Sequence, residues 1–196
     1  MVIKIKICGV NNLEDVKMLN SFNIDFIGMI NDKISPRYVD EEKIQKAMEI
    51  TKIPIVTVIA NYKIEDIQYI KTKYIQIHRI LNDNELEELK NFNKKFILYV
   101  PSSLKYLDYL KKTESYSDMI LLDTLNKNQK ADKRILRKMI DHSVKIGIAG
   151  GINADNIKDF IDLDPYWIDI SRGVEILPGK KDPFLVKKIL EVVKNY

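Results

Sequence analysis

The chain has 196 residues, of which 45% are hydrophobic and 31% charged, proportions typical of a globular domain and not of a disordered chain. Its net charge is +4, from 32 basic and 28 acidic residues that are mixed along the sequence, so no basic block predicts binding to nucleic acid or a membrane. Cys8 is the one cysteine, which excludes an intrachain disulfide, and with no signal-like or membrane-spanning apolar stretch we expect a cytoplasmic protein.

Short apolar segments alternate with amphipathic ones along the whole chain. The amphipathic segments space their apolar residues by three to four positions, which predicts helices, most clearly at 40–51, 83–91 and 183–194 and least clearly at 102–112. Asn12 and Asn153 are placed to cap helix starts. Segments rich in Ile, Val, Leu, Phe and Tyr predict eight strands, at 2–8, 25–30, 54–60, 74–78, 95–100, 118–122, 145–149 and 167–171.

This alternation predicts an α/β fold built from right-handed βαβ units around a parallel sheet. Eight such units favour a single (β/α)₈ TIM barrel spanning 1–196, in a compact version whose helices and loops are trimmed because the chain is short for this fold. The alternative is an open doubly wound sheet, which usually has fewer strands and a glycine-rich first turn. The first turn here reads CGVNN and lacks that glycine pattern.

Active sites of such barrels lie at the carboxyl ends of the strands, and Cys8 ends the first strand. Strand alternation places Lys4, Lys6 and Cys8 on the face toward the barrel interior. The first and last strands are neighbours in a closed barrel, so we predict that Lys6 forms a buried ion pair with Asp169, because a buried charge needs a partner. Cys8 would lie in the barrel mouth, either as a structural buried cysteine or as a reactive group.

Three further polar residues follow predicted strands. Asp123, directly after four apolar residues, is either a helix cap or a site residue. Arg37, in SPRYV, could bind a substrate carboxylate bidentately or could be a surface arginine. His78, in QIHR, is either a site residue or a polar residue with structural partners. No histidine or cysteine motif has metal-ligand spacing, so no metal is expected.

The loops after the seventh and eighth strands are rich in small residues. In barrels of this kind, these two loops often hold a phosphate group. Glycines allow the backbone to approach an anion and to direct amide N–H groups at it. The sequence therefore predicts a phosphate site formed by Gly150, Gly151, Ser171, Arg172 and Gly173.

Six motifs, in this order, resemble those of the phosphoribosylanthranilate isomerase family and span nearly the whole chain. They read KICGV, SPRYV, QIH, LLDT, AGGIN and SRGVEILPGKKD. The resemblance implies the Amadori rearrangement of N-(5-phosphoribosyl)anthranilate in tryptophan biosynthesis. It implies that Asp123 is the general acid, that Cys8 is the general base, and that no cofactor is needed. It also implies that the two small-residue loops hold the phosphate and that Arg37 faces the anthranilate. A thiolate at Cys8 would be favoured by the positive charge of Lys6.

The sequence departs from the family pattern at three places. The segment after LLDT reads LNKNQKADKRIL, without the usual glycines and aromatic residue, so the enclosure of the substrate is in question. Arg79 replaces a glycine, and Arg172 replaces a serine. Two alternatives stay open at this point: another phosphosugar isomerase or epimerase, and a non-catalytic barrel that binds a phosphorylated ligand. Helix faces alone do not distinguish a monomer from a homodimer.

Overall fold

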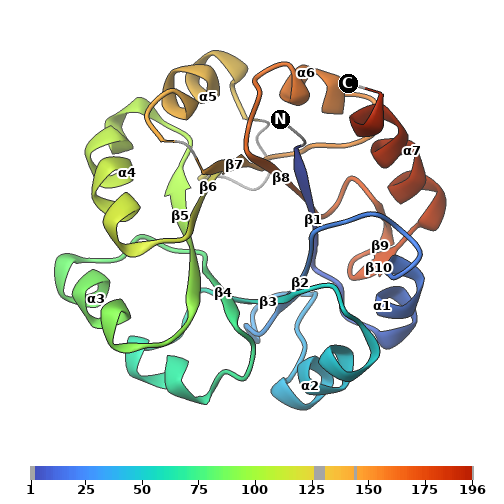
Figure 1. Ribbon diagram of the computed structural model, residues 1–196, viewed down its shortest axis with the longest axis horizontal. Helices are drawn as coiled ribbons and strands as arrows, with labels where there is room; N and C mark the ends of the chain where they lie inside the picture. Colours follow the sequence, from blue (N-terminus) through green and yellow to red (C-terminus); the bar gives the residue numbers. More distant parts are fainter. Residues whose placement is uncertain (1–2, 126–130, 144, 196) are drawn as a thin grey trace.

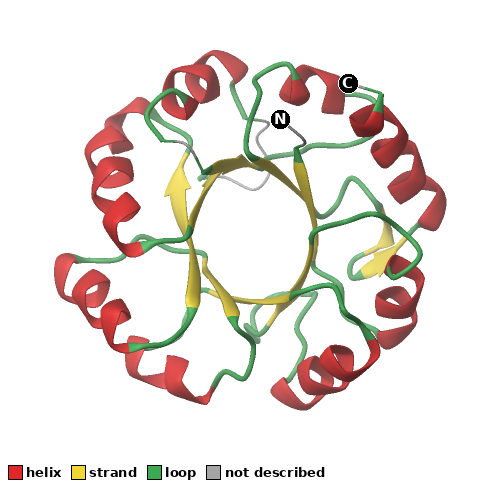
Figure 2. Ribbon diagram, viewed as in Figure 1, coloured by secondary structure: helices red, strands yellow, loops and turns green. Residues whose placement is uncertain are grey.

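A closed barrel of parallel strands forms the centre of the molecule. The computed structural model describes residues 3–125, 131–143 and 145–195. Eight parallel strands close into a barrel in chain order, and Figures 1 and 2 show them as a ring surrounded by helices. The predicted TIM barrel is therefore confirmed, and the open sheet is excluded. The strands are β1 (Lys4–Cys8), β2 (Phe26–Ile30), β3 (Ile55–Ile59), β4 (Tyr74–Ile77), β5 (Lys95–Pro101), β6 (Met119–Asp123), β7 (Ile146–Ile148) and β8 (Trp167–Ile170).

The barrel closes where β1 pairs with β8, with Lys6 opposite Asp169. On its other side β1 pairs with β2, with Cys8 opposite Gly28. The strands agree with the predicted ranges to within a few residues, although residue 2 lies outside the described part of the chain.

The connections between strands are short, as a 196-residue barrel requires. The connection between β3 and β4 holds only a 3₁₀ helix, η1, and the predicted helix at 102–112 begins as 3₁₀ and becomes α4. The helical elements are α1 (Leu13–Leu19), α2 (Glu41–Ile50), η1 (Ile64–Tyr69), α3 (Asp83–Glu88), η2 (Leu89–Asn91), η3 (Leu104–Tyr106), α4 (Leu107–Thr113), η4 (Glu114–Tyr116), α5 (Lys133–Ile140), α6 (Ile157–Ile161) and α7 (Pro183–Lys194).

The two predicted helix caps have different outcomes. The Asn12 side chain accepts a hydrogen bond from the Asp15 N–H at 2.8 Å and caps α1. The expectation for Asn153 is wrong. Its side chain accepts from the N–H groups of Asp155 and Asn156 in a turn that precedes α6, and the N-cap residue of α6 is Asn156, which makes no side-chain cap hydrogen bond. The connection after β7 is short, and Asn153 lies about one turn before the N-cap position of α6.

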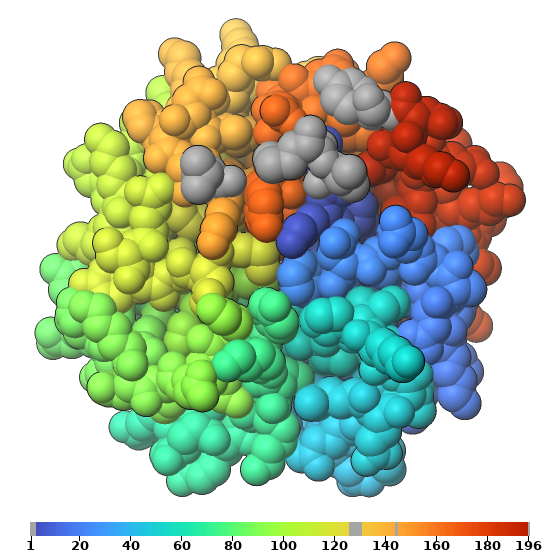
Figure 3. All heavy atoms as spheres, viewed as in Figure 1, coloured from blue at the N-terminus to red at the C-terminus, as the bar shows by residue number. Residues whose placement is uncertain are grey.

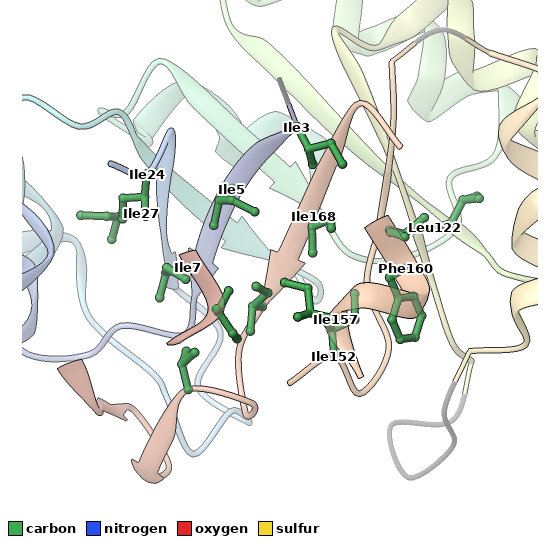
Figure 4. Close-up of a cluster of buried hydrophobic side chains, with 14 of the residues drawn as sticks. Ile3, Ile5, Ile7, Ile24, Ile27, Leu122, Ile152, Ile157, Phe160 and Ile168 are labelled. Carbon is green, nitrogen blue, oxygen red and sulfur yellow. The ribbon is translucent and has the colours of Figure 1, made fainter. Parts of the chain in front are cut away.

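The apolar side chains form two layers, as strand alternation requires. One layer lies between the strands and the helices, and Figure 4 shows Ile5 and Ile7 of β1 in it beside Ile168 of β8. The other layer fills the barrel itself, and Figure 3 shows no open channel where the ribbon leaves a ring. Trp167 is fully buried in this inner layer, opposite Gly147 on β7, where any side chain would collide with its ring.

A small antiparallel hairpin follows β8 and was not predicted. It consists of β9 (Glu175–Leu177) and β10 (Lys180–Lys181). Gly179 turns the chain between them at a positive φ of 88°. In Figure 1 the hairpin lies beside α1, so residues late in the sequence pack next to the first helix. Its backbone is joined there by a hydrogen bond from the Lys181 N–H to the Asp15 carboxylate at 2.6 Å.

Candidate active site

A pocket of about 420 Å³ opens at the carboxyl ends of the strands. Its polar groups come from loops and strand ends that lie far apart in the sequence, which is the arrangement expected of a barrel active site. All nine residues selected from the sequence line this pocket: Cys8, Arg37, His78, Asp123, Gly150, Gly151, Ser171, Arg172 and Gly173.

Cys8 lies on the inner side of β1 beside a buried ion pair. The Lys6 ammonium is 3.0 Å from both carboxylate oxygens of Asp169, and its side chain is fully buried. This confirms the predicted ion pair. Gly28, on the neighbouring strand, leaves the space for these groups, since a Cβ there would stand 2.8 Å from both the Cys8 Sγ and the Lys6 Nζ. A strand position without a side chain thus allows the thiol and the ammonium to approach each other.

Burial controls the protonation of this cluster. Burial raises the pKa of the Cys8 thiol above its ordinary value of 9.0, and the negative charge of Asp169 acts in the same direction, while Lys6 acts against both. The expectation that nearby positive charge would ionise Cys8 is therefore wrong, because desolvation of the thiolate outweighs the attraction of the ammonium. Burial alone would lower the pKa of Lys6, but Asp169 and Cys8 together raise it.

Asp123 ends β6 and lies near His78, the residue directly after β4. Its Oδ1 accepts a hydrogen bond from the Thr124 N–H at 2.7 Å, and its Oδ2 is 3.6 Å from His78 Nε2. On the other side of the imidazole ring, His78 Nδ1 is 3.2 Å from the Gln76 amide nitrogen. An amide nitrogen can only donate, so this contact places the proton of a neutral His78 on Nε2, facing Asp123. The centre of the Tyr99 ring lies 4.5 Å from that of the imidazole ring.

The two small-residue loops lie side by side. Gly150 and Gly151 adopt positive φ angles of 108° and 76°, which an L side chain would strain. Gly173 forms an isolated parallel bridge with Asn153, and a Cβ at Gly173 would stand 2.0 Å from the Ile152 carbonyl oxygen. The backbones of both loops therefore meet at one edge of the pocket. Arg172 is exposed at this edge.

Arg37 lines the pocket and already has an internal carboxylate partner. Its Nε and Nη2 donate to the two carboxylate oxygens of Glu175 at 2.8 and 2.6 Å. Its side chain is 14% exposed, so it is not a surface arginine. The Arg37 stem packs where Gly9 has no side chain. Two of the five guanidinium N–H groups are directed to Glu175. The directions of the other three are fixed by this contact, because the guanidinium group is planar and rigid.

Sequence reasoning missed the residues that hold this arrangement together. Glu175 and Lys181 lie on the unpredicted hairpin, and both are buried behind Arg37 and Cys8. Gln76 and Gly28 are ordinary strand residues in the sequence. The clearest available signal for the hairpin was the dipeptide Pro178–Gly179, which is typical of a turn.

The loop after Asp123 can be followed only in part. Residues 126–130 of the segment that departs from the family pattern lie outside the described residues. Beyond them, the Ala131 N–H donates to the Gly150 carbonyl at 3.3 Å. Among the described residues, no group of three or more His, Cys, Asp or Glu side chains is placed to hold a metal ion. In the same part of the chain no helix has the length and apolarity needed to cross a membrane.

The fold and the pocket define a (β/α)₈ barrel with a carboxylic acid, a thiol and two glycine-bearing loops at one end. Residues 5–192 match the family described as N-(5'phosphoribosyl)anthranilate (PRA) isomerase. A relative named N-(5'-phosphoribosyl)anthranilate isomerase from Saccharolobus solfataricus is 41% identical, over 98% of this chain and 97% of its own. This chain therefore belongs to the N-(5'-phosphoribosyl)anthranilate isomerase family, and it is an enzyme of the isomerase class.

Solved structures agree with this assignment. Phosphoribosyl anthranilate isomerase from Thermotoga maritima is similar with a TM-score of 0.88 and 25% identity, over 99% of this chain and 100% of that one. A second solved structure is a phosphoribosyl anthranilate isomerase in complex with reduced 1-(o-carboxyphenylamino)-1-deoxyribulose 5-phosphate. It is similar with a TM-score of 0.84 and 26% identity, over the same shares of the two chains.

Proposed function

We propose that this enzyme converts N-(5-phosphoribosyl)anthranilate into 1-(2-carboxyphenylamino)-1-deoxyribulose 5-phosphate, a step of tryptophan biosynthesis, in the cytoplasm. The observation that carries the proposal is that Cys8 and Asp123, from different strands, line one pocket together with the two glycine-bearing loops. The name of the 41% identical relative and the product-like ligand of the solved neighbour support the choice of substrate.

In the proposed mechanism, Asp123 is the general acid. It protonates the ring oxygen of the furanose, the C1–O bond breaks, and the nitrogen lone pair forms an iminium at C1. Asp123 must be protonated for this step, and its Oδ2 lies 3.6 Å from His78 Nε2. A carboxyl group held in a half-buried pocket suits this task, since an acid needs to release its proton toward the substrate and not toward water.

Cys8 is the proposed general base for the second step. It removes the proton from C2 of the sugar, and the C2–H electron pair forms the enolamine that rearranges to the ketone. Burial raises the pKa of the Cys8 thiol, so the thiol must release its proton to solvent through the mouth of the pocket before it can accept the proton from C2. The positive charge of the iminium, formed in the first step, favours this ionisation of the thiol.

The remaining pocket residues are proposed to bind the two ends of the substrate. The backbone amides of Gly150, Gly151 and Gly173, with Ser171 and Arg172, would hold the phosphate. Arg37, oriented by Glu175, would present its other N–H groups to the anthranilate carboxylate. His78 would contact the sugar between them.

The test is the decay of anthranilate-type fluorescence in substrate generated in situ. We expect rapid decay with the wild type and a loss of at least about 10²-fold in rate for Cys8→Ala and for Asp123→Asn. Binding of a reduced product analogue to both variants is the control for folding. Tight binding without turnover by the wild type would contradict the proposal and would indicate a barrel that only binds a phosphorylated ligand.

A further inference from the structure

Residues 175–181 of the hairpin take no direct part in the proposed chemistry, yet they bury a lysine behind the pocket. The side chain of Lys181 is 0% exposed. Its Nζ lies 2.6 Å from the Cys8 carbonyl oxygen, 3.3 Å from the Ser171 carbonyl oxygen and 2.7 Å from Glu175 Oε1. Three acceptors around one nitrogen require three N–H donors, so Lys181 is an ammonium ion.

The three acceptors belong to three different parts of the site. Cys8 is the proposed base at the end of β1, and Ser171 begins the proposed phosphate loop after β8. Glu175 continues the chain of contacts to Arg37 through two further hydrogen bonds. A single buried ammonium therefore links the base, the phosphate end and the anthranilate end of the pocket.

Lys181 is itself held in place from behind. Its backbone N–H donates to the Asp15 carboxylate of α1, and the Gly179 N–H donates to Glu175 Oε1 at 3.2 Å. Such a network is rigid when every member has its partners, and it fails as a unit when one member is lost. The network contributes no atom to the pocket lining at Lys181, so any effect on the reaction must pass through its neighbours.

We propose that Lys181 is the positioning residue of this active site, which holds the Cys8 backbone and, through Glu175, the Arg37 guanidinium in their working geometry. This inference rests on the proposed function, because it assigns Lys181 a task in that reaction.

The charges around Cys8 provide a second test of this inference, because they determine the pKa of its thiol. The charged groups that act on Cys8 are Lys6 on β1, Asp169 on β8, Lys181 on β10 and Arg37 after β2, and the two lysines lower the pKa of the thiol against burial and Asp169. Loss of Lys181 therefore raises the pKa of Cys8. Loss of the charge of Glu175 has the opposite effect, because Arg37 stays charged and then acts on Cys8 without its carboxylate partner.

The experiment measures the pH dependence of iodoacetamide alkylation by mass spectrometry, which reports Cys8 alone because the chain has one cysteine. The variants are Lys181→Met and Glu175→Gln, and the matched control is Lys180→Met, an exposed lysine on the same strand. We expect the alkylation midpoint to move up in Lys181→Met, down in Glu175→Gln, and not at all in the control.

Turnover gives the second readout. In Lys181→Met we expect kcat to fall by about 10²-fold, the effect of a small displacement of reacting groups, while Glu175→Gln raises KM because Arg37 loses its orientation. Shifts of both midpoints in the same direction, or a folded Lys181→Met with unchanged midpoint and kcat, would overturn the inference. If Lys181→Met does not fold, the downward shift in Glu175→Gln decides alone. If the wild type lacks isomerase activity, the proposed function fails, and opposite midpoint shifts still establish the arrangement around Cys8.

Discussion

Lys6 and Asp169 are neighbours in two senses. Their Cα atoms are register partners across β1 and β8, and their charged ends meet at 3.0 Å inside the barrel. The pair lies where the first strand joins the last. A charge of either sign alone at this depth would be strongly disfavoured, so the ion pair specifies which strands meet and in which register.

This relationship predicts a large penalty for removing one partner. We expect Lys6→Met to lower the free energy of unfolding by about 3–5 kcal/mol, because Asp169 is left buried without its cation. The double variant Lys6→Met with Asp169→Leu should lose clearly less than the sum of the single variants in urea denaturation. As a control, Lys46→Met removes an exposed pair with Glu42 and should leave the stability nearly unchanged. Additive losses in the double variant would show that the pair is not coupled.

A methyl group at Gly28 should disturb the proposed base directly. In Gly28→Ala the new Cβ would stand 2.8 Å from both Cys8 Sγ and Lys6 Nζ, so one of them must move. We expect a fall in kcat of at least about 10-fold, together with a loss of about 1–3 kcal/mol in stability from overpacking. Steady-state kinetics and urea denaturation of the same preparation measure both. Full activity at reduced stability would mean that the position of the thiol is not critical.

Arg79, which follows His78 at the end of β4, has a structural partner. Its guanidinium binds both oxygens of Glu85 at 3.0 and 2.6 Å, and it also donates to the Tyr62 carbonyl at 3.2 Å. The hydrogen bond from Arg79 lowers the pKa of Glu85 below its ordinary 4.5. The stability from this pair is therefore present above pH 4.5 and is lost as the pH falls through the lowered pKa.

We expect Arg79→Met to be less stable than the wild type by up to about 1 kcal/mol at neutral pH and the difference to shrink below pH 4.5. Arg79→Lys should restore only part of it, because an ammonium cannot bind both oxygens in the same planar geometry. Urea denaturation at neutral and acidic pH gives the comparison. A difference that does not vary with pH would assign the effect to packing of the arginine stem.

Tyr99 provides a prediction at alkaline pH. Burial, with a smaller contribution from Asp123, raises the pKa of Tyr99 from 10.0 to about 12. An acid whose pKa is raised on folding stabilises the folded state below its unfolded pKa, and that contribution is lost as pH rises from about 10 to 12. The wild type should therefore lose stability relative to Tyr99→Phe over this interval and not below it. Phenolate absorbance, as the difference between the two proteins, follows the same titration; a midpoint near 10 would contradict the burial argument.

The periodicity of the chain was sufficient to predict the barrel and the inner face of β1. Alternation along KIKIC placed Lys6 and Cys8 inside, and closure of the barrel then required Asp169 as the partner of Lys6. These predictions follow from local geometry and the cost of a buried charge, both of which can be evaluated from the sequence.

The support of the site could not be predicted in the same way. Strands β9 and β10 have three and two residues, too few for a periodic signal, and Glu175 meets Arg37 across 138 positions of sequence. The protonation of Cys8 depends on how completely the barrel excludes water, which the sequence does not reveal. The positive charge of Lys6 near Cys8 can be recognised in the sequence, whereas the larger effect of burial on the pKa of the thiol cannot.

The contact between Lys181 and the Cys8 carbonyl also has a consequence for biosynthesis. Translation delivers Cys8 173 positions before Lys181. A polypeptide that stops before the hairpin carries the complete set of pocket residues, yet lacks the group that orders them. The first strand therefore acquires its final surroundings only after the hairpin has been synthesised and has packed beside it.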